Sequence, residues 1–392
     1  MRDVIIVGAG PAGSALALQL AQLGCSVVLL DRARFPREKL CGDFLNPRCV
    51  ALLEELGVAA AVRAKSSSVK AMRVVAGGGE FRAAYPQGGS GLAIRRSELD
   101  RLLLERACAV RGVEFIEGAR AEELLYDGQT VCGVRVRLHG QRIPLTARIT
   151  VGADGRNSLV GHRLGLLRLH RRHRKTALGA RYEVAPLKTG MAEVFLGRRS
   201  YAIVNYLADG TANVSVVLDH PEFVAARQEG GGLWQRAVSR FPELWRRLHE
   251  ARQAAPVETL GPLARCARRV SFAGGLLVGD AAGFYDPFTG EGVCAALECA
   301  RIAAPVIRRA LEKGDVSARS LRAYERQRKR LLGVRLRLQQ LIQAVIGEPV
   351  VAGAFVRVLA ERPEAARRLL ALVGGVAPRV PEKAPGCGYC GT

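Results

Sequence analysis

Two hydrophobic patterns alternate along this chain. Short apolar runs rich in β-branched residues are typical of buried parallel strands, which are covered on both faces. Between them lie longer stretches with apolar residues three or four positions apart, which predicts amphipathic helices. The expected buried strands cover residues 4–7, 26–30, 113–117, 150–155 and 275–280, and the expected helices cover residues 11–23, 48–56, 97–107, 292–313 and 317–346. This alternation predicts an α/β protein with a parallel sheet.

Other regions alternate strictly between apolar and polar residues, which predicts antiparallel strands. Residues 70–84 have this pattern, and residues 122–149 predict a three-stranded antiparallel unit with a hairpin turn at Asp127-Gly128. Residues 177–218 contain four further β-rich stretches, and residues 222–250, which hold both tryptophans, are expected to be helical. We therefore predict an inserted antiparallel sheet domain covered by helices. The densely basic stretch at 162–175 is expected to be a solvated loop.

The first strand runs directly into a glycine-rich loop, Gly8-Ala9-Gly10-Pro11-Ala12-Gly13. In such a loop Gly8 makes the tight turn, Gly10 lets the backbone approach a pyrophosphate, and Gly13 lets the helix pack close to the strand. The helix that begins at Pro11 and Ala12 presents unpaired N–H groups and the positive end of its dipole. Asp31 lies 18 residues past Gly13, where a carboxylate accepts hydrogen bonds from an adenosine ribose. The segment predicts a dinucleotide site and leaves open whether the ligand is FAD or NAD(P).

Size and charge narrow the classes of function. A chain of 392 residues, 49% of them hydrophobic, is long enough for two domains or for one domain with an insertion. It has no charge-free apolar run of about 20 residues, and we expect a cytoplasmic protein because the first strand leaves no room for a signal peptide before it. The net charge of +23 fits a nucleic-acid partner, an anionic membrane or phosphorylated lipid, or simply solvated faces. We expect no nucleic-acid partner, because the arginines do not interleave with aromatic residues as in known binding modules.

The ten cysteines are scattered, mostly in apolar segments. In a cytosolic protein this distribution predicts small core residues rather than a disulfide framework. Cys387 and Cys390 in the tail lack the two further ligands that a zinc site needs nearby. We therefore expect no bound metal.

Two later segments bear on the identity of the dinucleotide. They are VGADGRNS at 151–158 and GDAAGFYDPFTGEG at 279–292. With the opening loop, and in this order, they resemble the FAD-binding fold of the glutathione-reductase type in its hydroxylase-like branch. The chain has no second GxGxxG preceded by a strand, which implies that NAD(P)H binds only transiently as an electron donor.

The resemblance implies roles for further residues in holding FAD. Asp280 is expected to hydrogen-bond the ribityl hydroxyls, and Pro287 to lie against the isoalloxazine ring. A helix that opens at the Gly290 to Gly292 turn would face the flavin with its positive dipole end, which stabilises an anionic reduced flavin. The remaining residues expected at the cofactor are Arg96, Asp154 and Gly279.

Within this branch, one family resembles the chain more closely. Residues 31–42, DRARFPREKLCG, look like the DR-x-x-FPR-x-K-x-CG stretch of geranylgeranyl reductases, which adds Arg32, Cys41 and Gly42 to the expected cofactor site. Of the PxxYxWxFP substrate motif of that family, this chain keeps Tyr201, has Ile203 at the tryptophan position and lacks the FP pair. The WxWxIP segment of flavin halogenases is absent.

The resemblance implies an FAD-dependent oxidoreductase that reduces C=C bonds of a prenyl or other hydrophobic substrate in an apolar cleft. Cys41, Asp43 and Tyr201 are the candidate catalytic residues, with Cys41 as a proton donor or a loop anchor. One alternative is an FAD-dependent monooxygenase acting on an aromatic, quinol-like or polyketide lipid. Another is a flavin electron-transfer protein docked on a membrane through the basic helix at 319–337.

The expected fold is α/β, with a Rossmann-like FAD-binding domain that has a parallel sheet and an antiparallel crossover. An inserted antiparallel β-sheet substrate domain and a C-terminal helical region complete it. The expected segments are 1–75, 95–160 and 272–315 for the FAD-binding domain, 76–94 and 161–271 for the substrate domain, and 316–392 for the C-terminal region. The expected partner is a hydrophobic small molecule, with a peripheral contact to the inner face of the membrane through the basic helix.

Overall fold

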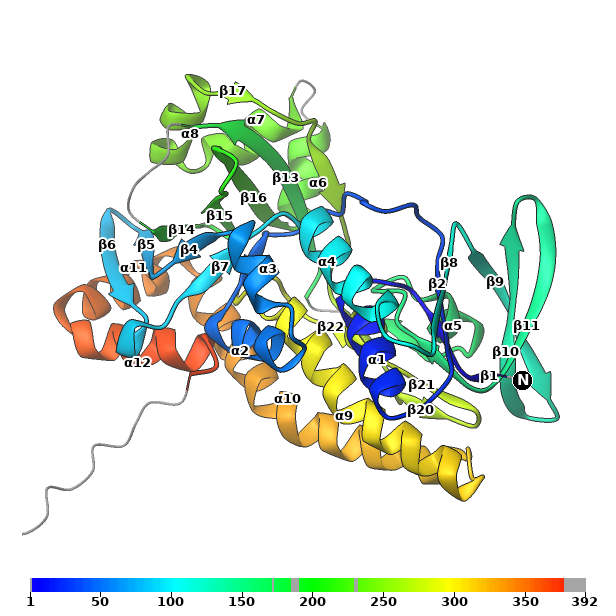
Figure 1. Cartoon of the computed structure of the whole chain (residues 1–392). Coiled ribbons are helices and arrows are strands. Elements are labelled where there is room, and N and C mark those ends of the chain that lie inside the picture. Colours follow the sequence, from blue (N-terminus) through cyan, green and yellow to red (C-terminus); the bar gives the residue numbers. More distant parts are fainter. Residues whose placement is uncertain (1, 171–172, 185–189, 229–231, 377–392) are drawn as a thin grey trace, which may run out of the picture.

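The structure is a computed structural model that describes residues 2–170, 173–184, 190–228 and 232–376. It contains two eight-stranded sheets, with a long C-terminal helical arm running beneath both of them (Figure 1). Cys387 and Cys390 lie outside the described residues.

The first large sheet carries the glycine-rich loop. Its order is β20-β21-β11-β1-β2-β8, and β10 and β9 extend from β11 as an antiparallel flap. The central strand β1 pairs in parallel with β2 and β11, and its four buried apolar residues explain why it lies in the middle. The strands are β1 (Arg2–Val7), β2 (Val27–Asp31), β8 (Val113–Glu117), β9 (Arg120–Asp127), β10 (Thr130–Leu138), β11 (Gln141–Gly152), β20 (Ser271–Phe272) and β21 (Gly275–Leu277).

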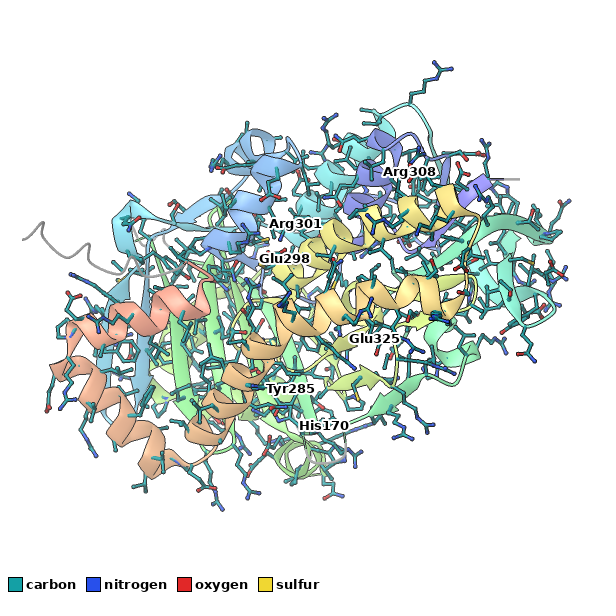
Figure 2. The ribbon with its side chains drawn as sticks, turned by 90° about the horizontal axis from the view of Figure 1, so that it is seen from below. His170, Tyr285, Glu298, Arg301, Arg308 and Glu325 are labelled. Carbon is teal, nitrogen blue, oxygen red and sulfur yellow. The ribbon has the colours of Figure 1, made fainter. Side chains whose placement is uncertain are left out.

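Long helices cover this sheet. α1 packs against α4 and α9, and α10 lies beside α9. Figure 2 shows α9 and α10 side by side across the lower face. The helices of this part are α1 (Pro11–Gln22), α2 (Pro47–Glu55), α3 (Ala59–Ala64), α4 (Arg96–Cys108), α5 (Leu159–Arg163), α9 (Gly292–Lys313) and α10 (Ala318–Ile346).

The second large sheet has the order β17-β13-β16-β15-β14-β5-β6, with β18 paired to β13. One face packs against α6, α7 and α8 through an apolar cluster that contains Trp234, and α11 and α12 pack against β5 and β6. The strands are β5 (Ala71–Ala76), β6 (Gly79–Ala84), β13 (Lys175–Glu183), β14 (Met191–Gly197), β15 (Ser200–Tyr206), β16 (Thr211–Asp219), β17 (Arg252–Gln253) and β18 (Glu258–Leu260). The helices are α6 (His220–Gln228), α7 (Leu233–Ser239), α8 (Pro242–His249), α11 (Pro349–Glu361) and α12 (Pro363–Val373).

Two three-stranded sheets join these layers. One has β7 between β3 and β4, and the other has β19 between β12 and β22. Their strands are β3 (Phe44–Leu45), β4 (Ser67–Val69), β7 (Gly91–Ala93), β12 (Leu167–Leu169), β19 (Arg265–Ala267) and β22 (Gly283–Phe284).

Three local expectations are corrected. The region 222–250 is not one helical stretch, because Phe241 precedes Pro242 with a non-helical φ/ψ and separates α7 from α8. The strand at 275–280 ends at Leu277, and Asp280 lies in a single 3₁₀ turn that begins at Gly279 with a φ of +59°. The stretch 162–175 is not all solvated loop, because Lys175 is buried at the start of β13.

The long helices at 292–313 and 317–346 are confirmed, as is the antiparallel unit at 122–149. β5 pairs with β14 in the second sheet, so residues 71–75 of the first expected segment belong to that sheet. Among the described helices, none alone is both long enough and apolar enough to cross a membrane. α10 and α11 meet that test only as a pair, across a bend of 109°.

Candidate active site

A cavity of about 1030 Å³ is lined by both large sheets and by the C-terminal helices. All but two of the residues expected at the cofactor line it. The two exceptions, Gly13 and Gly279, lie directly behind its wall. The lining members are Gly8, Gly10, Pro11, Ala12, Asp31, Arg32, Cys41, Gly42, Arg96, Asp154, Asp280, Pro287, Gly290 and Gly292.

The glycine-rich loop is packed too tightly for side chains. Gly8 has a φ of +104°, and a Cβ on it would lie 2.5 Å from the carbonyl oxygen of Ala153. A Cβ on Gly13 would lie 1.8 Å from the carbonyl oxygen of Gly8, so α1 can approach β1 only with glycine there. α1 has no side-chain cap at Gly10, which leaves its first N–H groups free to bind an anion at the cavity wall.

Asp31 is held at the edge of the cavity by backbone groups. Its Oδ2 accepts from Ala9 N and its Oδ1 from Ala33 N, both at 2.9 Å. Each carboxylate oxygen keeps a lone pair for a further donor such as a ribose hydroxyl. Arg37, whose role was not predicted, lies beside it, with Nη2 at 3.2 Å from the buried Asp100.

Arg96 and Cys41 meet where the two sheets come together. Arg96 forms a bidentate pair with the buried Asp100, in which Nε donates to Oδ1 at 3.1 Å and Nη2 donates to Oδ2 at 3.0 Å. Burial lowers the pKa of Arg96, but Asp100 and Cys41 more than offset this, and the pKa lies above its ordinary value. Burial also raises the pKa of the Cys41 thiol, with Arg96 opposing it, so the thiol is protonated at neutral pH. A protonated thiol in the cavity wall can donate a proton.

The loop that carries Cys41 is fixed by the second sheet. Asn213 Nδ2 on β16 donates to the carbonyl oxygen of Cys41 at 2.7 Å, and Asn205 Nδ2 on β15 donates to that of Gly42 at 2.8 Å. Arg181 on β13 donates to Glu38 at 3.0 Å. These long-range contacts fix the loop that carries Cys41 against the second large sheet.

Asp43 is a buried structural carboxylate that does not line the cavity. It adopts a φ of 54°, and its Oδ1 accepts from Arg96 N at 3.1 Å. Burial raises its pKa to about 6, although Arg181 and Arg96 oppose the shift. Its position favours a role in holding the loop over direct contact with substrate.

The raised pKa of Asp43 gives a testable pH dependence. A carboxyl whose pKa is raised in the folded protein makes its full contribution to stability at pH values below its pKa in the unfolded chain. This contribution is lost as the pH rises through about 6. The shift corresponds to about 3 kcal/mol. We expect the free energy of unfolding of Asp43→Asn, relative to wild type, to be higher at about pH 8 than at about pH 4, measured by urea unfolding of the FAD-loaded proteins. A difference that does not vary with pH would contradict the assignment.

Lys39 belongs to the FPR-x-K-x-CG stretch, and its place at the cavity was not predicted. It lines the cavity. Burial lowers the pKa of its ammonium group, the positive charge of Arg96 lowers that pKa further, and Asp280 opposes the shift. Within the described ranges, Lys39 forms no hydrogen bond or salt bridge with the protein. It is therefore available to the phosphates or ribityl chain of a bound cofactor.

The loop between β22 and α9 forms the opposite wall. Gly279, in the 3₁₀ turn before β22, lets that turn pack on α1, because a Cβ there would lie 2.8 Å from Ala12 Cβ. Gly290 has a φ of +64° and its Cβ would lie 2.6 Å from the Phe44 ring. α9 begins at Gly292 without a side-chain cap, so a second helix N-terminus faces the cavity.

Tyr201 is fully buried beneath this loop and does not line the cavity. Its hydroxyl donates to Asp286 Oδ1 at 2.7 Å, and its ring meets Phe288 edge-on. Asp286 Oδ2 contacts His173 Nε2 at 2.9 Å and Lys175 Nζ at 3.7 Å. Burial raises the pKa of Asp286, but these partners more than offset it, so its pKa lies below its ordinary value. Tyr201 thus supports the loop that contains Pro287.

α10 holds the same loop from behind through side chains spaced one helical turn apart. Gln343 Nε2 donates to Asp286 Oδ1 at 2.8 Å, and Gln339 Nε2 donates to Glu291 Oε2 at 2.8 Å. Arg335 Nε lies 3.8 Å from Glu291 Oε1. The C-terminal arm is therefore part of the site.

The far end of the cavity is apolar. It is lined by the inner faces of β5, β6, β14, β15 and β16 and closed by α10, α11 and α12. The lining apolar residues here include Met72, Val74, Phe81, Ala83, Ala192, Val194, Leu196, Ile203, Val217, Ile342, Ile346, Phe355, Ala366, Leu369, Leu370 and Val373.

The polar end fits FAD. Two helix N-termini face it, the glycines leave room for a close backbone approach, and Asp31 can receive a ribose. Asp154 Oδ2 accepts from Leu159 N at 2.6 Å, while its Oδ1 is buried without a protein partner and can accept from a ligand. These features require no change in the fold to hold the cofactor.

Known proteins are similar to most of this chain. Residues 1–334 match the sequence profile of the FAD binding domain family. A digeranylgeranylglycerophospholipid reductase from Methanopyrus kandleri is 32% identical over 82% of this chain and 84% of its own. A menaquinone reductase from Mycobacterium tuberculosis is 30% identical over 78% and 76%.

Solved structures share the fold. A geranylgeranyl bacteriochlorophyll reductase-like protein from Thermoplasma acidophilum superposes with a TM-score of 0.82 at 22% identity, covering 94% of this chain and 96% of its own. A flavin-dependent brominase superposes with a TM-score of 0.83 at 21% identity, covering 96% and 94%. The chain is an FAD-dependent oxidoreductase that belongs to the FAD binding domain family and, within it, to the group of geranylgeranyl reductase-like proteins.

Proposed function

We propose that this protein reduces carbon–carbon double bonds in the prenyl chain of a lipid or quinone, with NAD(P)H as the electron donor. The observation that carries this proposal is the shape of the cavity. Its polar, cofactor-binding end continues directly into a long apolar end closed by α10 to α12. The names of two relatives, a digeranylgeranylglycerophospholipid reductase and a menaquinone reductase, support the same class of substrate.

The side chains divide the work of such a reaction. Bound FAD supplies a two-electron carrier that can deliver a hydride to one alkene carbon. The apolar walls exclude water from the prenyl chain of the substrate, and the Cys41 thiol supplies the proton for the second alkene carbon. Asn205 and Asn213 hold the Cys41 loop, and Tyr201 and Asp286 hold the loop with Pro287.

Cys41→Ala is expected to slow the oxidation of reduced flavin by substrate about 100-fold, because the proton donor is lost. Reduction of the flavin by NAD(P)H should keep its rate, since Cys41 takes no part in it. Stopped-flow absorbance measures the two half-reactions separately. If both rates match wild type, Cys41 is only an anchor of its loop.

The reaction class is tested without oxygen. The flavin of the anaerobic protein should bleach on addition of NAD(P)H, and a geranylgeranyl lipid should then restore the oxidised absorbance with no oxygen present. Recovery of the oxidised flavin only when oxygen is admitted, and never with the lipid alone, would favour the monooxygenase. This experiment includes the monooxygenase because the substrate motif of geranylgeranyl reductases is incomplete here, with Ile203 in place of its tryptophan.

A further inference from the structure

Exposed apolar side chains gather on the C-terminal arm. The described part of the chain has eleven large hydrophobic residues that are exposed, and seven of them lie on α10, α11 and α12. The most exposed are Val350 at 82%, Val334 at 67% and Leu341 at 63%. An exposed cluster of this kind marks an interaction surface rather than scattered surface variation.

Five of these side chains lie on α10 and α11, on either side of the bend between the two helices. Leu336 is set apart from them, because two residues along a helix turn it by about 200° from Val334. Val334 and Leu341 are seven residues apart on α10, which places them on the same side of the helix. α11 follows α10 across a bend of 109°. Val350 and Val351 are exposed at this corner, and Val358 lies about two helical turns further along α11. We call this set, together with Leu372 on α12, the corner surface. Figures 1 and 2 show α11 running outward from the end of α10 and α12 turning back toward the rest of the molecule.

The corner surface is flanked by positive charge. The segment 318–373 contains twelve Lys and Arg residues and four Glu residues. Arg330, Arg337 and Arg357 are exposed next to the apolar stripe and have no salt-bridge partner in the parts of the chain that the structure describes. An amphipathic helical face with apolar residues interspersed with arginines binds anionic lipid surfaces. An interface with a second copy would instead be depleted of charge at its centre.

The same helices line the apolar end of the cavity with their opposite faces. Ile342 on α10 lines the cavity, while its neighbour Leu341 is exposed on the outside. Val373 on α12 is likewise an inner residue beside the exposed Leu372. The corner surface and the apolar end of the cavity are therefore separated by a single layer of helix, about 10 Å thick.

We propose that the corner surface docks on an anionic lipid bilayer and brings the apolar end of the cavity to the membrane. Val350, Val351 and Leu341 insert among the acyl chains, and the flanking arginines contact the lipid phosphates. This refines the expected membrane contact, which moves from the basic helix at 319–337 to the corner between α10 and α11. The docking itself does not depend on the reaction assigned to the site.

Vesicle flotation of the FAD-loaded protein tests this proposal. The protein should bind vesicles made of phosphatidylglycerol and phosphatidylcholine in about equal amounts, and binding should weaken with salt. Binding to vesicles of phosphatidylcholine alone should be at least tenfold weaker. The double variant Leu341→Glu, Val350→Glu should lose at least tenfold in affinity for the anionic vesicles while keeping its flavin absorbance.

A control is Tyr126→Glu, which places one negative charge, against two in the double variant, on a residue that is 50% exposed on β9, away from the corner surface. This variant should bind as wild type does. Equal loss in Tyr126→Glu, or no loss in the double variant, would overturn the proposal. A dimer in analytical ultracentrifugation that the double variant dissociates would assign the surface to a second copy instead. Because flotation requires no turnover, its result is independent of a failed assay for prenyl reduction.

Discussion

A Gly13→Ala protein is expected to purify without FAD and to unfold at a lower temperature than wild type. The added Cβ would lie 1.8 Å from the carbonyl oxygen of Gly8, so α1 must move away from β1. Such overpacking costs about 3 kcal/mol in a rigid core. The same movement withdraws the N-terminus of α1 from the cofactor phosphates. Flavin absorbance relative to protein and the thermal unfolding midpoint measure both effects.

Gly10→Ala separates cofactor binding from folding. A Cβ on Gly10 meets only the Arg37 guanidinium, at 3.4 Å, so this variant should fold with nearly normal stability. It should still bind FAD about 100-fold more weakly, because the methyl group occupies the approach of the pyrophosphate. Gly333→Ala is the control, because a Cβ on Gly333 has no neighbouring atom within 4 Å. This variant should lower neither the stability nor the affinity for FAD. FAD content equal to wild type in Gly10→Ala would contradict the position of the cofactor.

Ala366→Phe should block the apolar end of the cavity. Ala366 lines that end from α12 and is 1% exposed, so a phenyl ring there takes space from a long chain. We expect kcat/KM for a geranylgeranyl lipid to fall about 100-fold. FAD content and the rate of flavin reduction should stay as in wild type. A substrate with a shorter prenyl chain should lose much less, because it does not reach α12.

The neighbouring residue supplies the control. Ala365 is exposed on the outer side of the same helix, so Ala365→Phe adds an equal side chain without entering the cavity. It should leave kcat/KM unchanged for both substrates. Equal losses for long and short chains in Ala366→Phe would mean that the variant disturbs the fold, and the apolar end would then have no demonstrated role in binding.

The cofactor end could be predicted because it depends on local sequence. The glycine loop and Asp31 lie on one strand–helix–strand unit, and the tight packing that requires Gly8 and Gly13 is set within that unit. The helix at 292–313 was likewise recognisable from its periodicity and the glycine turn before it. In such segments, neighbours in sequence are also neighbours in space.

The apolar end of the cavity depends on long-range contacts that periodicity does not reveal. Tyr201, Ile203 and Asn205 share one face of β15, as the two-residue period requires. Asn205 holds the Cys41 loop and Ile203 lines the cavity, but Asp286 and Phe288 cover Tyr201. No pattern within the strand distinguishes these three outcomes.

The contribution of α10 escaped prediction for the same reason. Gln339 and Gln343 have the composition of a solvated helical face, yet they bond to the loop with Asp286 and Glu291. Lys39 was visible in the FPR-x-K-x-CG stretch, but only the fold brings it to the cavity wall beside Arg96. A lysine or glutamine gives no sign in sequence of which partner it will meet.

The central claim is tested most directly by the mass of the product. The FAD-loaded protein, NAD(P)H and a geranylgeranyl lipid are incubated once without oxygen and once under oxygen-18 gas, and the lipid is analysed by mass spectrometry. We predict a lipid that gains two hydrogen atoms for each reduced double bond in both incubations, with no oxygen-18. A product that forms only under oxygen and carries oxygen-18 would contradict it and identify the protein as a monooxygenase.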